Sequence, residues 1–147
     1  NHIMGAYPSA RHVGLYDKDK LVCCISYKRT EEKGIEISRF ASLLNTSVVG
    51  GLSKLLSYVK KATNPDYFVY FVDLRYSQGE SVNSLGFSLV SVGLGFRWTN
   101  GRKTFHRYIC RANMDERRLT EKEHAKELGL YKIFDAGQAK FIMNLTT

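Results

Sequence analysis

The stretch LNTSVVGGLSKLLSYVKK, residues 44–61, decides the fold because it joins an expected strand to an expected helix. A Gly-Gly pair at Gly50 and Gly51 opens the helix, and free backbone N–H groups at a helix N-terminus can hold a phosphate. The same glycines can also act only as the bend between strand and helix. Both interpretations stay open at this point. The helix itself is indicated by apolar residues at helical spacing, namely Val49, Leu52, Leu55, Leu56 and Val59.

The segments on either side of this helix read as strands. HVGLYDKDKLVCCISYKR, residues 12–29, predicts a hairpin with a DKDK turn, and GIEISRFASLL, residues 34–44, predicts a third strand. The segment NPD, residues 64–66, is expected to end the helix. YFVYFVD at residues 67–73 then forms a nearly continuous apolar run. Such a run without polar alternation is typical of a strand covered on both faces.

The second half predicts further strands and two shorter helices. GESVNSLG at residues 79–86 fits a short helix, and FSLVSVGLGFRW at 87–98 fits two strands around a Gly-rich bend. KTFHRYICR at 103–111 reads as another strand after the turn TNGR. LTEKEHAKEL at 119–128 predicts a helix, with Thr120 and Glu123 in a capping box and Gly129 as the stop. YKIFDAGQAKFIMNL at 131–145 is expected to close the chain as a hairpin.

This order predicts an α/β fold, a single mixed sheet flanked by helices with an added C-terminal hairpin, as one domain over residues 1–147. The length suits one domain, and 44% hydrophobic with 24% charged residues is ordinary globular composition. No apolar run is long enough to cross a bilayer, so no membrane partner is expected. The first residue is not Met, and we expect the chain to be a fragment of a longer one.

The charge of the chain favours a polyanionic partner. The formal net charge is +8 and the pI is about 9.5, which points to nucleic acid first. The three Cys residues do not form a disulfide framework and are interpreted as buried, reduced thiols. His12 and His124 are interpreted as surface or strand-edge residues.

The segment GFRWTNGRKTFHRYICR, residues 95–111, carries the strongest nucleic-acid signal. Basic residues alternate with aromatic ones, and no acidic residue lies between residues 97 and 111. Basic side chains neutralise phosphates and aromatic faces can stack on exposed bases. An ordinary solvated hairpin is the alternative. The expected DNA-binding residues are Arg97, Trp98, Arg102, Lys103, His106, Arg107 and Arg111. The helix that follows carries charges of both signs and reads as a solvated face.

Asp73 is the most informative carboxylate, because it ends an apolar strand at the edge where α/β sheets open to ligands. One interpretation is structural: an ion pair with Arg39 or Arg75, or a cap for the next helix. The other is functional: a base, a metal ligand or a contact to a DNA base. His2 and His106 could join Asp73 in a metal site, but nothing in their spacing requires one and no metal is predicted.

The order of elements from residue 12 to 92 resembles the acyl-CoA N-acyltransferase (GNAT-like) fold. VVGGLSKLL, residues 48–56, would be the family's pyrophosphate turn and helix, and SVNSLGF, residues 81–87, its late helix and strand. The chain departs from the family at three positions. Ser47 stands where the basic residue of the turn belongs. Leu52 stands where a small residue lets the pyrophosphate approach, and Val82 stands where many members carry a Tyr as general acid. The cofactor is therefore left unknown, with acyl-CoA disfavoured, and Gly50, Gly51 and Leu52 are expected to bind a phosphate if they bind anything.

A closer resemblance covers nearly the whole chain. NHIMGA, GLYDKDKLVCCISY, ISRFASLLNTSVVGGLSKLLSYV, YFVDLRYSQGESVNSLGF, HRYICR and GLYKIFDAGQAKFIMNL resemble, in order, a domain that follows the nuclease in many phage homing endonucleases. The pattern is similar, more distantly, to the Mom-type DNA-modification proteins. That resemblance implies a site made of His2, beside Asn1, with Arg39 and Asp73. The resemblance to the homing-endonuclease domain implies a cytoplasmic location in a phage-infected bacterium and a nuclease domain ahead of Asn1 in the parent chain.

Two functions follow from the resemblance. The first is a DNA-binding domain, accessory to a homing endonuclease, without chemistry of its own. The second is a Mom-like transferase that modifies a DNA base, with Asp73, Arg39 and His2 as tentative catalytic residues. No paired carboxylates with a His at nuclease-like spacing occur in the sequence, so a nuclease site is not expected in this chain.

Overall fold

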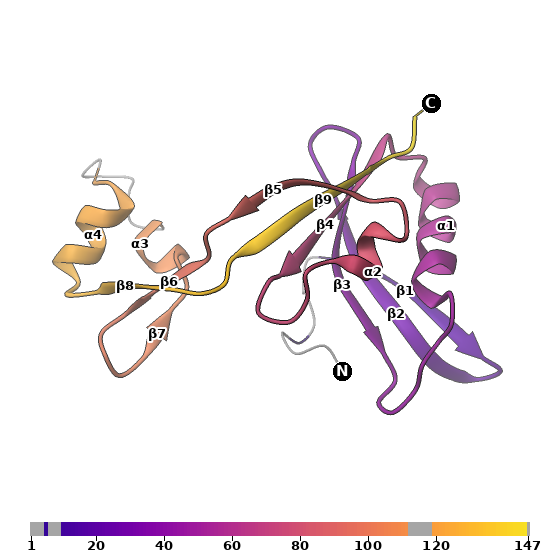
Figure 1. The fold of residues 1–147 in the computed structure, drawn as a ribbon, viewed down its shortest axis with the longest axis horizontal. Helices are drawn as coiled ribbons and strands as arrows, with labels where there is room; N and C mark the ends of the chain where they lie inside the picture. The colour runs from indigo at the N-terminus through magenta and orange to yellow at the C-terminus, as the bar shows by residue number, and fades with distance from the viewer. Residues whose placement is uncertain (1–4, 6–9, 112–118, 147) are drawn as a thin grey trace. The chain divides into compact units, whose positions relative to one another are not determined.

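The computed structural model describes Gly5, residues 10–111 and residues 119–146 (Figure 1). The strands are β1 (Arg11–Asp17), β2 (Lys20–Arg29), β3 (Ile35–Ser42), β4 (Tyr67–Asp73), β5 (Ser88–Gly93), β6 (Phe96–Thr99), β7 (Thr104–Phe105), β8 (Tyr131–Phe134) and β9 (Gln138–Asn144). The helices are α1 (Gly51–Thr63), α2 (Glu80–Asn83), α3 (Tyr108–Arg111) and α4 (Glu121–Glu127).

The described chain divides into two compact units. The main unit comprises the described residues up to Val72, Gly79–Ser91, and the described residues from Lys140 onward. The inserted unit comprises Asp73–Gln78 and the described part of Val92–Ala139. The assignment of residues 1–147 to a single domain remains a prediction beside this division.

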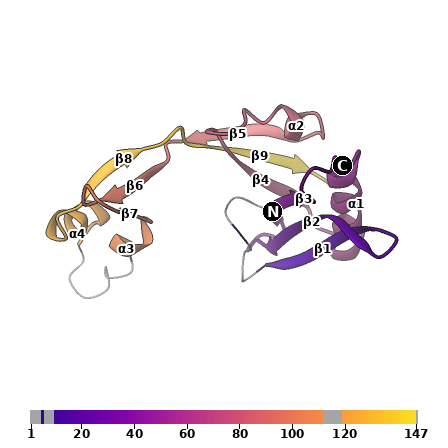
Figure 2. The same ribbon diagram turned by 90° about the horizontal axis from the view of Figure 1, so that it is seen from below.

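The larger sheet has six strands in the order β1-β2-β3-β4-β9-β5. β1, β2 and β3 pair antiparallel, whereas β3 and β4 pair parallel across the crossover helix α1, so the sheet is mixed (Figure 2). The parallel pairing joins only three residue pairs, from Ile35 with Phe68 to Ile37 with Tyr70. Both strands continue beyond these pairs, β3 to Ser42 and β4 to Asp73. The mixed α/β fold class is therefore confirmed.

Helix α1 begins at the glycine pair, and the two glycines serve different purposes. Gly50 has a left-handed backbone with a φ of 67°, and a side chain there would meet open space. Gly51 is buried, and an added Cβ would lie 2.9 Å from Cys23 Sγ and 3.0 Å from Val48 Cγ1. Gly50 therefore makes the turn, and Gly51 lets the helix pack closely against β2.

The core of the main unit lies between α1 and the sheet. Leu55, Leu56 and Val59 are the buried apolar face of α1, and Ile25, Ile35 and Phe68 are buried strand residues. Val49, predicted on the same helical face, is exposed because it precedes the first helical residue. The expectation that β4 is covered on both faces is wrong for Phe71, whose side chain is 42% exposed.

The inserted unit has a sheet in the order β7-β6-β8 and a small core of Trp98, Cys110 and Ala125. The predicted strand at residues 103–111 is corrected here. Only Thr104 and Phe105 pair with β6, and the chain then turns into α3, which places Cys110 in the core. α4 starts with the predicted capping box of Thr120 and Glu123.

The predicted hairpin at residues 131–145 is also corrected. Its two strands form, but β8 pairs with β6 in the small sheet, whereas β9 lies between β4 and β5 in the large one. The DAGQ segment therefore connects a strand of the small sheet to a strand of the large sheet. Asp135 Oδ1 accepts the backbone N–H of Gly137 at 2.8 Å, which is a turn geometry without strand pairing across it.

Two further residues, Cys24 and His124, differ from expectation. Cys23 and Cys110 are buried free thiols as predicted, but Cys24 is only half-buried. His12 is an exposed strand residue as predicted, whereas His124 is buried, 7% exposed, with Nδ1 2.9 Å from the Cys110 carbonyl oxygen. Its place on the inner side of α4 explains the error.

The close approach at Gly51 generates a prediction about stability. We expect Gly51→Ala to lower the free energy of unfolding by about 1–3 kcal/mol, as overpacked core sites do. Removing the obstructing sulfur with Cys23→Ala should recover part of this loss. Gly50→Ala is the matched control, since it costs backbone strain of about 1–2 kcal/mol that Cys23→Ala cannot relieve. Urea unfolding of the single and double variants gives the coupling free energy of Cys23→Ala with Gly51→Ala and with Gly50→Ala. Equal coupling energies would contradict the assignment of close packing to Gly51 alone.

Candidate functional site

Asp73 ends β4, and its carboxylate is held by a near neighbour. It accepts the backbone N–H of Arg75 at 3.0 Å and the Arg75 Nε–H at 2.9 Å. The Arg75 Nη2 also bonds the second carboxylate oxygen. These bonds lower the pKa of Asp73, and the nearby Arg97 charge lowers it further. Of the two partners considered, Arg75 is the one observed, and Asp73 is ionised at neutral pH.

Arg39 is the second tentative catalytic residue. Arg39 lies on β3 opposite Ser26, and its Nη1 donates to the carbonyl oxygen of Ser38 at 2.7 Å. Arg39 belongs to the main unit and Asp73 to the inserted unit. His2 lies outside the described residues. A joint site of the three residues therefore stays a prediction.

The glycine turn offers fewer free donors than its sequence indicates. The Gly51 N–H donates to the carbonyl oxygen of Val48 at 3.0 Å, so it is already engaged. Gly50 makes no side-chain cap, and no acidic residue lies in the first turn of α1. The N–H groups of Leu52 and Ser53 remain as the donors that an α-helix leaves without intrahelical partners. Phosphate binding at Gly50, Gly51 and Leu52 stays a prediction, and Leu52 is half-buried.

The tip between β6 and β7 presents two of the expected DNA-binding residues. Arg102 and Lys103 are exposed, and both backbone N–H groups donate to Asn100 Oδ1, at 3.0 and 2.8 Å. Thr99 Oγ1 donates to the Lys103 carbonyl oxygen and accepts the Gly101 N–H. These four bonds order the tip, and both cationic residues are exposed on it.

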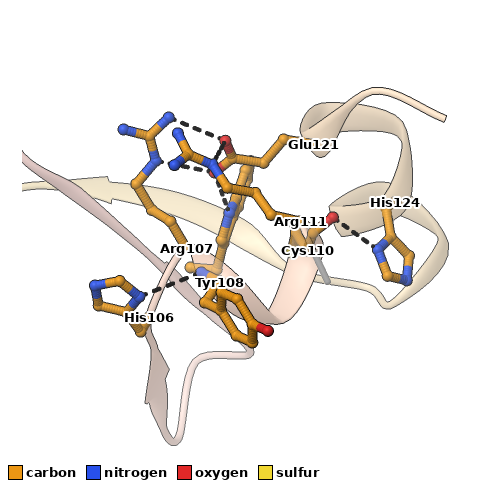
Figure 3. A network of polar contacts seen from close by, with 8 residues as sticks. His106, Arg107, Tyr108, Cys110, Arg111, Glu121 and His124 are labelled. Atoms are coloured by element: carbon orange, nitrogen blue, oxygen red, sulfur yellow. Dashed lines mark hydrogen bonds and ion pairs between the residues drawn. The ribbon is translucent and has the colours of Figure 1, made fainter. Parts of the chain in front are cut away.

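Arg107 and Arg111 converge on one carboxylate, that of Glu121 (Figure 3). Arg107 makes a bidentate pair, with Nε 3.0 Å from Oε1 and Nη2 2.9 Å from Oε2. Arg111 Nε donates to Oε2 at 3.0 Å, and Trp98 Nε1 donates to Oε1 at 3.1 Å. The Arg107 bonds are the largest cause of the lowered pKa of Glu121, which is about 2. The two arginines are thus neutralised in part by a partner within the chain.

The aromatic residues of this unit form a cluster around Phe96. The Arg107 guanidinium carbon lies 4.0 Å from the centre of the Phe96 ring, and Lys132 Nζ lies 4.1 Å from it. Trp98 and Phe134 both pack edge-on or tilted against the same ring. Such cation–aromatic contacts fix the positions of the two cations.

The geometry disfavours one of the expected DNA contacts, Trp98, and leaves His106 and Arg97 as predictions. Trp98 is 4% exposed and its N–H is used by Glu121, so its ring cannot stack on a base. His106 is exposed, but its Nδ1 accepts the Tyr108 N–H at 3.2 Å, a local turn contact (Figure 3). Arg97 is half-buried beside Asp73. Among the basic residues of 95–111, the exposed ones that make no ion pair with Glu121 are therefore Arg102 and Lys103 at the tip.

Sequence reasoning missed three residues that organise this region: Glu121, Lys132 and Asn100. Glu121 was interpreted as one charge on a solvated helix face. Its position directly after the Thr120 N-cap was a usable signal, since the first turn of a capped helix is fixed in space. No comparable signal in the sequence indicated that Lys132 reaches Phe96.

No group of His, Cys, Asp and Glu side chains suited to a metal ion occurs within residues 10–111 and 119–146. Within the same ranges, no helix is both long and apolar enough to cross a membrane.

No protein-family model and no curated protein matches this sequence. Solved structures do resemble the fold. An acetyltransferase of Bacillus subtilis in complex with CoA aligns with a TM-score of 0.57 and 15% identity, covering 94% of this chain and 78% of the other. An IAA acetyltransferase from Bacillus cereus gives 0.56 and 14%, covering 94% and 79%. A GNAT family acetyltransferase from Elizabethkingia anophelis with acetyl-CoA bound gives 0.55 and 16%, covering 94% and 78%.

The structure and these likenesses define the class of protein at the level of fold. The chain is a GNAT-like α/β domain, with a mixed sheet flanked by helices. In this chain, β6, β7, α3, α4 and β8 lie in sequence between the last two strands of the large sheet, β5 and β9.

The Glu121 cluster generates a prediction about pH. Its folded-state pKa of about 2 lies below the ordinary 4.5, so its stabilisation is fully present above about pH 4.5 and is lost as the pH falls toward 2. We expect Glu121→Gln to be less stable than wild type at neutral pH, and the difference to shrink on acidification across this window. Urea unfolding followed by fluorescence of Trp98, the single Trp, measures it. A difference that is constant from pH 6 to pH 2 would contradict the prediction, and Glu32→Gln in an exposed turn serves as control.

Proposed function

We propose that the chain is a DNA-binding GNAT-like domain that contacts the phosphate backbone through the β6–β7 tip. The carrying observation is the ordered, exposed tip with Arg102 and Lys103, in a segment without acidic residues from 97 to 111. The resemblance to the domain that follows the nuclease in phage homing endonucleases supports an accessory role of this kind. The net charge of +8 supports a polyanionic partner.

The order of the tip matters for affinity, because a cation on a fixed backbone loses less conformational freedom on binding than one on a mobile loop. Asn100 and Thr99 supply that order through the bonds to their side chains. A two-stranded hairpin is also narrow enough to enter the major groove of B-DNA.

Exposed aromatic residues of the inserted unit supply a second mode of contact. Tyr108, Tyr131 and Phe134 are 69%, 71% and 65% exposed. Aromatic faces of this kind stack on unpaired bases without regard to sequence. These three residues replace the buried Trp98 as the expected base-stacking set.

The proposal predicts the effect of removing the tip charges. Arg102→Ala with Lys103→Ala should weaken duplex DNA binding and make the plot of log affinity against log salt shallower by about 2, since each lost phosphate contact contributes about 0.9. Fluorescence anisotropy over a salt series measures the slope. Lys60→Ala with Lys61→Ala removes the same charge from the exposed last turn of α1 and should leave the slope unchanged.

Equal slopes in the tip variant and the wild type would reject the tip as the contact. If the tip variant and the α1 control lose the same DNA affinity, the interaction depends only on the overall charge of the chain and not on the tip. Arg107→Ala is a poor substitute for the tip variant, because it also removes the bidentate partner of Glu121.

A second candidate function is group transfer, including Mom-like modification of a DNA base. The observation that favours it is the short pairing of β3 and β4, which joins only three residue pairs, in a fold shared with structures that hold CoA or acetyl-CoA. Leu52 and Val82 count against an ordinary acetyltransferase, since Val82 is buried and carries no proton to donate. Asp73 and Arg39, with His2, would be the residues of such a site.

Transfer activity predicts a saturable donor and a new mass on the acceptor. Calorimetric titration with acetyl-CoA tests the donor, and mass spectrometry of nucleosides from DNA incubated with protein and donor tests the acceptor. Asp73→Asn should abolish any modification while leaving the tip-dependent DNA binding intact. DNA binding without a bound donor or a modified base would leave the accessory role as the function and reject transfer from acetyl-CoA.

A further inference from the structure

The large sheet carries a groove of about 470 Å³ over β4 and β9. Its floor is made of alternate residues of two strands, Val69 and Phe71 on β4 with Lys140 and Ile142 on β9. Residues two apart on a strand point to the same face. Phe71 is 42% exposed in this groove, so an aromatic face is open to a ligand.

The groove lies on the face of the sheet opposite the contacts of α2. Tyr70 packs edge-on against Phe87, and Phe141 closely approaches Gly79 at the start of α2. Tyr70 and Phe141 alternate with the groove residues along their strands, so they point to the other face. The groove is therefore separate from the helix-covered core.

One end of the groove is built firmly. Tyr67 lies at the start of β4, and its hydroxyl is 3.0 Å from Thr30 Oγ1. Thr30 Oγ1 in turn accepts the Gly34 N–H at 3.0 Å. A side chain at Gly34 would collide with the Tyr67 ring, 2.3 Å from an added Cβ. The β2–β3 turn is thus packed onto Tyr67, which fixes the carboxylates of that turn near the groove.

The charge of the groove opposes the charge of the whole chain. Glu31, Glu32 and Glu36 line it, and Lys140 is the single cation among its lining residues. Glu36 is also paired with Lys28 at 3.2 Å, which leaves Glu31 and Glu32 as the carboxylates at the rim. A protein of net charge +8 repels cations in general, so a local excess of carboxylates is a selective feature.

We propose that this groove binds a small organic polyamine. Its volume falls in the range of about 300–1,000 Å³ that is typical of small-molecule sites. The Phe71 ring can hold a cationic group over its face, the aliphatic floor of Val69 and Ile142 suits methylene chains, and Glu31 and Glu32 suit ammonium groups. The residues that line the groove include neither the tip residues Arg102 and Lys103 nor Asp73, so the polyamine proposal does not rest on either proposed function.

Calorimetric titration of the full chain with spermidine, without DNA, tests the proposal. We expect saturable one-to-one binding that Glu31→Gln with Glu32→Gln weakens by about tenfold or more, equivalent to about 1.4 kcal/mol. Asp17→Asn with Asp19→Asn is the matched control, since it removes the same charge from the β1–β2 turn and should leave the affinity unchanged. Phe71→Ala should weaken binding as well, because it removes the aromatic face.

Each outcome decides the matter. Absence of saturable heat at low salt, or equal weakening in the groove and control variants, overturns the proposal. Mg²⁺ added in place of spermidine separates the ligand classes, since a metal ion needs carboxylates and not Phe71. If Mg²⁺ binds as tightly as spermidine and Phe71→Ala affects neither, the groove is a carboxylate patch and the polyamine assignment is wrong. All substituted residues are exposed, so loss of the fold does not confuse the readout.

Discussion

The short parallel pairing of β3 and β4 is the constraint on which the rest of the large sheet depends. It requires a crossover, which α1 supplies, and the crossover requires a turn tight enough to place the helix against β2. Gly51 permits that approach to Cys23 and Gly50 permits the left-handed turn before it. The left-handed turn at Gly50 and the close packing at Gly51 are therefore sufficient to explain the glycine pair.

A different interaction organises the inserted unit, whose core is small. Glu121 accepts bonds from Arg107, Arg111 and Trp98, and the same Arg107 stacks on Phe96. The carboxylate thus links α4, α3 and β6. In this unit, bonds between charged side chains contribute stability that a larger apolar core would otherwise provide. Arg107 and Arg111, which the sequence suggests for DNA binding, are therefore partly engaged in stabilising their own unit.

Local patterns predicted the elements well and their partners less well. The capping box at Thr120, the amphipathic α1 and the strands up to Asp73 follow from short-range spacing, which the sequence displays directly. The pairing of β8 with β6 depends on residues about 35 positions apart, which no local pattern reveals. The strand predicted at 103–111 failed because its apolar residues also satisfy one helical turn around Cys110. At the site, Arg102 and Lys103 were identifiable from charge, whereas the burial of Trp98 depends on its packing with Cys110 and Ala125, which are distant in sequence.

Average charge is a poor guide to a chain built in this way. A net charge of +8 suggests a uniformly basic surface, yet the inserted unit carries both an exposed basic tip and two arginines that share one carboxylate, and the main unit carries an acidic groove. Salt screens charges more than about 10 Å away, so the charges that touch a ligand decide its binding more than the net charge of the chain does. It follows that a basic tip and an acidic groove can serve different ligands in one chain without either cancelling the other.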